Sequence, residues 1–461
     1  MSKQSGNRLS GNSQSGNAKF GKTQPENAQF GKTPPGNASS GTRYPGLNGL
    51  MRRIASGVVA GVLFAGLAGV LPLACAHEGH EHGSAAASAK KAKRTELGIS
   101  AAVDAQGRLW IVSKQSGAAG DHVVVRHSSD EGKTWSAALR VNAKPEPVAA
   151  PGEERPRILT GSKNQLYVVW TRPGSKNYAG DIRFAASPDA GASWSVPVTV
   201  QQYIPENGQP VSHRHPVVTE DGNGLLYVAW IDRRDVERAK VKGETHPGAS
   251  AYYAVSDNGG KSWRGDYQLS NATCDCCRLA LQTGSDGVPV AFWRQVFANS
   301  ERDHALARLT PDGRNLTLAR ATQDQWQVEA CPDHGPSLAL TGQTRHAVWF
   351  DMVQQNGMVF YGRLTNAPES IKIEGLRTLP DGAEHADIVA SGDAVWVAWQ
   401  RFDGQQNSIG TMTSTDGGQN WREATVASSR GAVDQPRLVL QGKRAFLIWN
   451  TAEQGLLVRK L

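Results

Sequence analysis

The chain has 461 residues and a formal net charge of +8, from 50 Lys and Arg against 42 Asp and Glu. Most of this excess lies near the start, where residues 1–53 carry eight basic residues and Glu26 as the single acid. The rest of the chain is close to neutral, so its charge gives no support for a nucleic-acid partner.

Residues 1–50 are of low complexity and rich in Gly, Ser, Asn and Pro, so we expect a disordered extension that cannot bury a core. Residues 51–76 read as a signal peptide: two arginines follow Met51, an apolar run follows them, and Ala74-Cys75-Ala76 offers a cleavage site. This pattern also makes Met51 an alternative start. It predicts an exported, periplasmic protein with no transmembrane segment after cleavage. A lipid anchor on Cys75, giving an outer-membrane lipoprotein, is the alternative.

Residues 77–96 join the signal peptide to the rest of the chain. Cleavage after Ala76 would place an α-amine beside the His77 imidazole, with His80 and His82 close behind. Neutral amine and imidazole nitrogens suit Cu(II), Ni(II) or Zn(II), so these histidines are candidate metal ligands, the alternative being a solvated tail. The basic run that follows is expected to be a linker.

One short pattern, Ser-x-Asp/Asn-x-Gly-x-x-Trp, occurs four times and follows an alternating apolar stretch each time. The Asp or Asn accepts hydrogen bonds from a turn, Gly supplies a positive φ, and Trp covers the hairpin. We therefore expect each copy between two antiparallel strands. The copies are Ser128-x-Asp130-x-Gly132-x-x-Trp135, Ser187-x-Asp189-x-Gly191-x-x-Trp194, Ser256-x-Asn258-x-Gly260-x-x-Trp263 and Ser414-x-Asp416-x-Gly418-x-x-Trp421.

From residue 97 a unit of about four short strands recurs at the period of a propeller blade. Residues 97–461 are therefore predicted to be all-β, a β-propeller of four-stranded antiparallel blades, with seven blades and six as the alternative. The Trp residues that end most second strands are expected to pack between blades. The predicted second strands are 108–113, 166–170, 226–230, 290–293, 347–349, 395–399 and 446–449.

The repeated pattern is the Asp box, and it resembles the BNR-repeat, sialidase-superfamily group of β-propellers. The Cys-x-Cys-Cys at Cys274 and the Cys-Pro-x-x-Gly-Pro at Cys331 are similar to an exported bacterial group of that superfamily. The resemblance implies a site with three arginines for a substrate carboxylate, an acid/base Asp, and a Tyr nucleophile paired with Glu. This chain departs from it, because Arg157-Ile158 is followed by Leu159 where the family has Pro. The catalytic residues are therefore not carried over.

In a propeller, the loops before the first strand of each blade converge on one mouth of the central channel. Arginines in these loops predict that the mouth binds an anion or an anionic substrate. Cysteines and histidines in the same loops, together with the histidine tail, form a candidate soft-metal site. The anion-binding candidates are Arg155, Arg157, Arg214, Arg278 and Arg437. The metal candidates are Cys274, Cys276, Cys277, Cys331, His213, His215, His334, His385, His77, His80 and His82.

Two interpretations of the four later cysteines stay open: two disulfides in an oxidising compartment, or thiolate ligands for copper or zinc. We expect an exported β-propeller binding protein with a Cys/His/Arg-rich channel mouth that binds copper or another soft metal. The partner at this mouth would be a small ligand, a metal ion or a protein. The alternatives are an exo-sialidase-type glycosidase acting on acidic sugars and a protein-interaction scaffold. Whether the chain is an enzyme is left open.

Overall fold

The computed structural model describes residues 96–461, apart from 177, 206–207, 328–332, 354–355 and 367–370. The predicted extension, signal peptide and histidine tail, with His77, His80 and His82, lie outside the described residues, as does Cys331. Among the helices of the described part, none has the length and apolar character needed to cross a membrane.

The described residues form antiparallel sheets in which consecutive strands pair with each other, except that β12 and β13 both pair with β14. The first sheet contains β1 (Ile99–Val103), β2 (Leu109–Gly117), β3 (Gly120–Ser128) and β4 (Leu139–Arg140). The second contains β5 (Arg157–Thr160), β6 (Leu166–Pro173), β7 (Gly180–Ser187) and β8 (Val198–Thr199). An eight-stranded sheet contains β9 (His213–Glu220), β10 (Leu226–Asp232), β11 (Ala249–Ser256), β12 (Arg264–Thr273), β13 (Ala280–Thr283), β14 (Pro289–Val296), β15 (Arg302–Arg308) and β16 (Leu318–Arg320).

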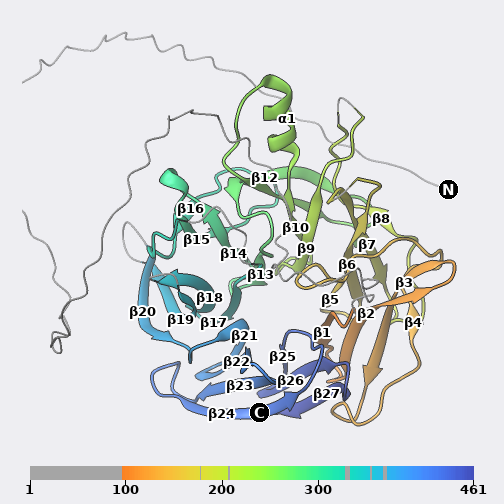
Figure 1. Cartoon of the computed structure of the whole chain (residues 1–461). Coiled ribbons are helices and arrows are strands. Elements are labelled where there is room, and N and C mark those ends of the chain that lie inside the picture. Colours follow the sequence, from red (N-terminus) through yellow and green to blue (C-terminus); the bar gives the residue numbers. More distant parts are fainter. Residues whose placement is uncertain (1–95, 177, 206–207, 328–332, 354–355, 367–370) are drawn as a thin grey trace, which may run out of the picture. The chain divides into compact units, whose positions relative to one another are not determined.

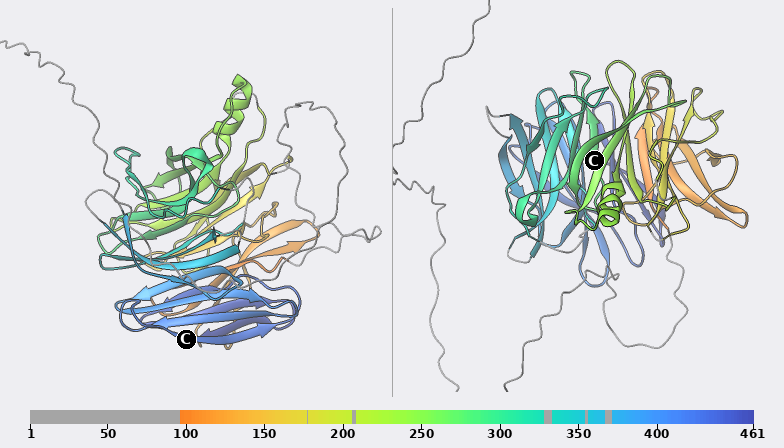
Figure 2. Two further views of the ribbon diagram at one scale, coloured as in Figure 1. Left: turned by 60° about the vertical axis from the view of Figure 1, so that its left-hand side comes forward. Right: turned by 90° about the horizontal axis from the view of Figure 1, so that it is seen from above.

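Three further sheets complete the fold, the last with three strands. They contain β17 (Ser337–Thr341), β18 (Thr344–Val353), β19 (Asn356–Asn366) and β20 (Ile371–Thr378); β21 (Ala383–Ser391), β22 (Ala394–Phe402), β23 (Asn407–Ser414) and β24 (Arg422–Ser429); and β25 (Arg437–Gln441), β26 (Arg444–Thr451) and β27 (Gly455–Lys460). Helix α1 (Arg234–Lys242) follows β10 and projects from the sheets, and a short 3-10 turn, η1 (Ala298–Ser300), precedes β15 (Figure 2).

The sheets are arranged around a common centre, as Figure 1 shows. The innermost strands contact one another in a closed ring that runs from β1 through β5, β9, β13, β17, β21 and β25 back to β1. This arrangement is a β-propeller, as the sequence predicts. The number of blades stays a prediction, because β9–β16 form one continuous sheet, joined where Thr273 pairs with Gln295.

The core lies between neighbouring sheets. The apolar second strands are central in their sheets, and the predicted ranges lie within β2, β6, β10, β14, β18, β22 and β26 to within one residue. Trp170 and Trp230, which end two of the predicted second strands, are fully buried, Trp170 in a cluster with residues of the first sheet and Trp230 in a cluster with residues of the second. The prediction that the repeated Trp residues pack between blades is confirmed at these positions, and such burial is a major stabilising contribution.

The four Asp boxes occupy the turns after β3, β7, β11 and β23. In the first, the Ser128 hydroxyl donates to Asp130 Oδ1 (2.8 Å) and accepts from the Gly132 amide (2.8 Å). The Thr134 amide donates to Asp130 Oδ1 (2.9 Å), and Gly132 has φ +86°. The Thr134 hydroxyl also donates to Asp130 Oδ2 (2.6 Å). This hydrogen bond and then those from the Thr134 amide and Ser128 lower the pKa of Asp130 to about 2. The box thus stabilises its turn with hydrogen bonds from its own residues.

Candidate functional site

Two buried ion pairs hold the centre of the channel mouth together. Arg155 precedes β5 and lies against Asp434, which precedes β25 (Nη1 to Oδ1, 2.7 Å), with both side chains almost fully buried. Asp434 also accepts from the Ile99 amide (2.9 Å), so this pair joins the first, second and last sheets. This ion pair therefore helps to hold the three sheets together.

The second pair joins Glu153 to Arg278, before β13 (Oε1 to Nε, 3.5 Å). Glu153 Oε2 also accepts from the amides of Arg278 (3.1 Å) and Gly335 (2.8 Å). Although burial opposes ionisation, Arg278 and these amides hold the pKa of Glu153 at about 2. Glu153 therefore stays ionised and fixes two channel loops.

Arg157 and Arg437 differ from these arginines because neither forms an ion pair within the described residues. Arg157 begins β5 and is partly exposed, and its Nη2 donates to the Glu153 carbonyl (3.3 Å). Arg437 begins β25, is buried, and donates to Gln435 Oε1 (2.9 Å). Burial and then the neighbouring guanidinium groups lower the pKa of Arg437 to about 9 and that of Arg157 well below its usual value. Positive charge is therefore in excess at this point.

A third group surrounds Glu154, which pairs with Arg214 of β9 (Oε2 to Nε, 2.9 Å). Glu154 Oε1 accepts from the His215 amide (3.0 Å), and the ring Nδ1 of His215 lies 3.3 Å from Oε2. Tyr178, which the sequence did not single out, faces the Arg214 guanidinium at 5.3 Å. The structure therefore uses Arg214 and His215 to hold Glu154.

His334 and His385 stack on each other at 4.2 Å between ring centroids, and His334 also stacks on Phe350 at 4.3 Å. Gln435 donates to Nδ1 of His385 (3.0 Å). Burial lowers the pKa of His334 to about 4 and that of His385 to about 3, so both rings are neutral at pH 7. They form an uncharged wall beside the arginines.

Among the mouth carboxyls, Asp333 is set apart by its environment. Asp275 is held by Arg233 and by the Ala249 amide (2.7 Å), and Asp387 by Ser337 and the Leu438 amide. Although its side chain is exposed, the removal of water by the surrounding mouth loops and then the charge of Glu153 raise the pKa of Asp333 to about 6. A carboxyl that titrates near neutrality is a candidate acid/base group.

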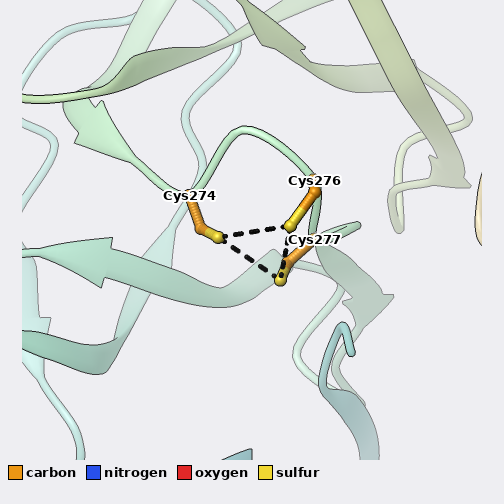
Figure 3. A group of neighbouring side chains, drawn as sticks. All are labelled: Cys274, Cys276 and Cys277. Atoms are coloured by element: carbon orange, nitrogen blue, oxygen red, sulfur yellow. Dashed lines mark hydrogen bonds between the residues drawn. The ribbon is translucent and has the colours of Figure 1, made fainter. Parts of the chain in front are cut away.

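Cys274, Cys276 and Cys277 come together in the loop between β12 and β13 (Figure 3). Their sulfurs are separated by 3.7 Å (Cys274–Cys276), 3.8 Å (Cys276–Cys277) and 3.5 Å (Cys274–Cys277). A disulfide bond is about 2.05 Å long, so none of the three is bonded to another. Cys274 and Cys277 carry thiols, which excludes two disulfides among the four later cysteines, whereas Cys276 is disulfide-bonded.

The predicted histidine ligands do not join this sulfur group in the described part of the chain. His213 is instead engaged by the Gly180 carbonyl (2.8 Å) and lies near Asp232 (3.5 Å). His215 lies against Glu154, and His334 and His385 stack on each other. The structure thus divides the predicted mouth into an arginine region, a histidine wall and a cysteine loop.

Arg294 of β14 was missed by the sequence reasoning, although it contacts the cysteine loop directly. Its Nη1 donates to Cys277 Sγ (3.0 Å), and its carbonyl accepts from the Cys274 amide (3.2 Å). Asp351 was missed too. It is fully buried, and its carboxylate lies in a cluster with those of Asp303 and Asp324. A charged residue inside the apolar run Phe292-Trp293-Arg294 was the available signal.

No family model matches this chain, and no curated protein matches it. Among solved structures it is similar to a PL25 ulvan lyase bound to -[GlcA(1-4)Rha3S]- (TM-score 0.48, 10% identity, covering 77% of this chain and 90% of that one). It is also similar to the Hadza microbial sialidase Hz136, with a TM-score of 0.48 and 12% identity, covering 75% of this chain and 74% of that one. A Dyadobacter fermentans protein of unknown function has a TM-score of 0.45 and 16% identity, covering 70% of this chain and 95% of that one. At these TM-scores the likenesses define no function for this chain.

Proposed function

We propose that this protein is an exported β-propeller that binds an anionic ligand at its channel mouth. The observation that carries the proposal is the pair Arg157 and Arg437, which form no ion pair in the described residues although the neighbouring Arg155 and Arg278 do. Export is supported by the signal-like segment 51–76.

Electrostatics favours an anion between these two guanidinium groups. Their pKa values are lowered because burial and like charges penalise the cationic form. A bound carboxylate would relieve that repulsion, and a guanidinium group matches a carboxylate in planar, bidentate geometry. The Nε atom of Arg437 has no hydrogen-bond partner among the described residues, which leaves a donor for such a ligand.

We take an acidic sugar as the ligand class, because the Asp boxes resemble those of sialidase-superfamily propellers. Hydrolysis of such a sugar is the second candidate function, and Asp333, with a pKa near 6, is the observation that favours it. The Tyr nucleophile that the resemblance implies has two candidates: Tyr203, which lies over the Arg234 guanidinium group at 4.6 Å, and Tyr178, which is exposed beside Arg214.

Calorimetric titration with N-acetylneuraminic acid, glucuronic acid and neutral galactose tests the proposal. We expect one of the acids to bind and galactose not to bind. Replacing Arg157 or Arg437 by Ala removes a charge-assisted hydrogen bond of about 1.5–3 kcal/mol, a loss of roughly 10- to 150-fold in affinity. Arg437→Lys should recover part of that loss, because it restores charge without the bidentate fork.

Arg444→Ala is the matched control, since Arg444 forms an exposed pair with Glu131 and lies outside the mouth. Equal affinity in Arg437→Ala and Arg444→Ala would refute the anion site. Release of a fluorescent leaving group from a sialoside, abolished in Asp333→Asn, would establish the hydrolytic candidate. Binding without release would leave the protein a binding module.

A further inference from the structure

The three-cysteine loop is independent of the arginine region and carries a chemistry that the proposed function does not use. Cys274 and Cys277 are buried, with 1% and 2% of their surface exposed, while Cys276 is partly exposed. Figure 3 shows the three sulfurs facing one another across a single turn of the loop. Soft thiolate groups at this spacing are the ligands of soft metal ions.

The loop is held in this shape by contacts on both sides. Asp275, between the first two cysteines, forms an ion pair with Arg233 and accepts from the Ala249 amide (2.7 Å). The Cys274 amide donates to the Arg294 carbonyl (3.2 Å), as does the hydroxyl of Thr273 (2.8 Å). The loop that carries the sulfurs is thus held by contacts with Arg233, β11 and β14.

The distances fit a metal ion. With metal–sulfur bonds of about 2.3 Å, neighbouring sulfurs lie about 3.8 Å apart in a tetrahedral site and about 4.0 Å apart in a trigonal one. The observed separations are 3.5, 3.7 and 3.8 Å. A shift of a few tenths of an ångström would therefore suffice to close the three sulfurs around an ion.

The number of sulfur ligands favours a monovalent ion. Arg294 donates to Cys277 Sγ (3.0 Å) and places a buried positive charge beside the sulfurs. This charge stabilises thiolates and offsets part of their negative charge. Structural zinc sites take four ligands, whereas the described residues supply three sulfurs, and thiolates are also the preferred ligands of Cu(I).

We propose that Cys274, Cys276 and Cys277 form a three-thiolate site for Cu(I) that opens when the disulfide of Cys276 is reduced. An external thiol reductant supplies two electrons and two protons, and the disulfide becomes two thiols. Binding of Cu(I) then forms three Cu–S bonds and releases the protons of the thiols that are still protonated. In the oxidised protein two sulfurs remain and the site is incomplete.

The test uses the whole chain with residues 77–82 deleted, so that the histidine tail contributes no background. The protein is titrated anaerobically with Cu(I) against a chromogenic Cu(I) chelator, before and after reduction by a phosphine. We expect one tightly bound Cu(I) per reduced chain, at least a tenfold weaker affinity in the oxidised chain, and three sulfur neighbours at about 2.3 Å by X-ray absorption.

Cys277→Ser and Cys276→Ser should each weaken Cu(I) binding at least tenfold, and Cys276 is the safer change because it is partly exposed. Cys75→Ser and Cys331→Ser make the same change outside the three-cysteine loop. The one that removes the disulfide partner of Cys276 should bind Cu(I) without any reductant, and the other is the matched control, which should behave like the parent protein. Undiminished binding in Cys276→Ser, or equal binding by oxidised and reduced protein, would overturn the proposal. Preferential binding of Zn(II) would overturn the monovalent assignment.

Discussion

The Asp-box turns and the channel mouth are both built from polar side chains on tight loops, yet their Ser, Asp and Asn side chains on one side and their Arg and His side chains on the other differ in how they are hydrogen-bonded. In every box the Ser hydroxyl and the Asp or Asn oxygen have partners within the same turn. At the mouth, Arg437 Nε and His334 Nδ1 are buried and have no hydrogen-bond partner in the described residues. Hydrogen-bonded polar groups stabilise a fold, whereas buried polar groups without a partner are typical of ligand-binding sites.

The largest effect is expected where the mouth is structural as well as charged. Asp434→Ala leaves Arg155 buried without its carboxylate, which should lower the free energy of unfolding by about 3–5 kcal/mol. Glu131→Ala, which breaks the exposed pair with Arg444, should cost less than about 1 kcal/mol. Urea unfolding of the two variants measures both. Equal losses would show that the mouth pair carries no special stability.

A smaller effect is expected from breaking a box. Gly418 has φ +82°, and a Cβ there would lie 1.9 Å from the Tyr361 hydroxyl. Gly418→Ala should therefore destabilise the fold by about 1–3 kcal/mol through backbone strain and overpacking. Affinity for the anionic ligand should stay unchanged, because the boxes follow the third strands of their sheets and the mouth loops precede the first, which in antiparallel sheets puts them at opposite ends of the strands. Thermal unfolding and calorimetry on one sample separate the two readouts, and a loss of affinity in the folded variant would contradict the division between the regions.

The same contrast explains what the sequence could predict. The boxes and second strands are local patterns, so the propeller and the phase of its channel loops follow from residues close together in the chain. The partners of the mouth residues are not local. Glu154 accepts a hydrogen bond from His215, which is 61 residues away, and so holds His215 apart from the cysteines. Arg294 is brought to Cys277 by the pairing of strands.

The choice between paired and unpaired arginines depends on such distant contacts as well. All five candidate arginines look alike in sequence, because each lies at or just before the start of a first strand, beside other polar residues. Asp434 engages Arg155 across 279 residues, while Arg437, three positions after Asp434, forms no ion pair in the described residues. Side-chain direction decides this, and no pattern in the chain records it.

The smallest predicted effect is a pH dependence that separates the two regions by its sign. The pKa of Asp130 is lowered to about 2 in the folded state, so the stability that its box gains is present above about pH 4 and is lost as the pH falls from there towards 2. The pKa of Asp333 is raised to about 6, so its contribution is present below about pH 4 and is lost as the pH rises through 6.

Ligand binding should follow Asp333. Above pH 6 its carboxylate adds a negative charge to the mouth, so affinity for an acidic sugar should fall by roughly three- to tenfold between pH 5 and 7.5, an effect of about 1 kcal/mol. His334 and His385, with pKa values of about 4 and 3, stay neutral over this range and add nothing to the change. Calorimetry across that interval should show the fall in the parent protein and a flat profile in Asp333→Asn. A fall that persists in the variant would assign the titration to another group, and the excess of positive charge at Arg157 and Arg437 would then be regulated from elsewhere in the mouth.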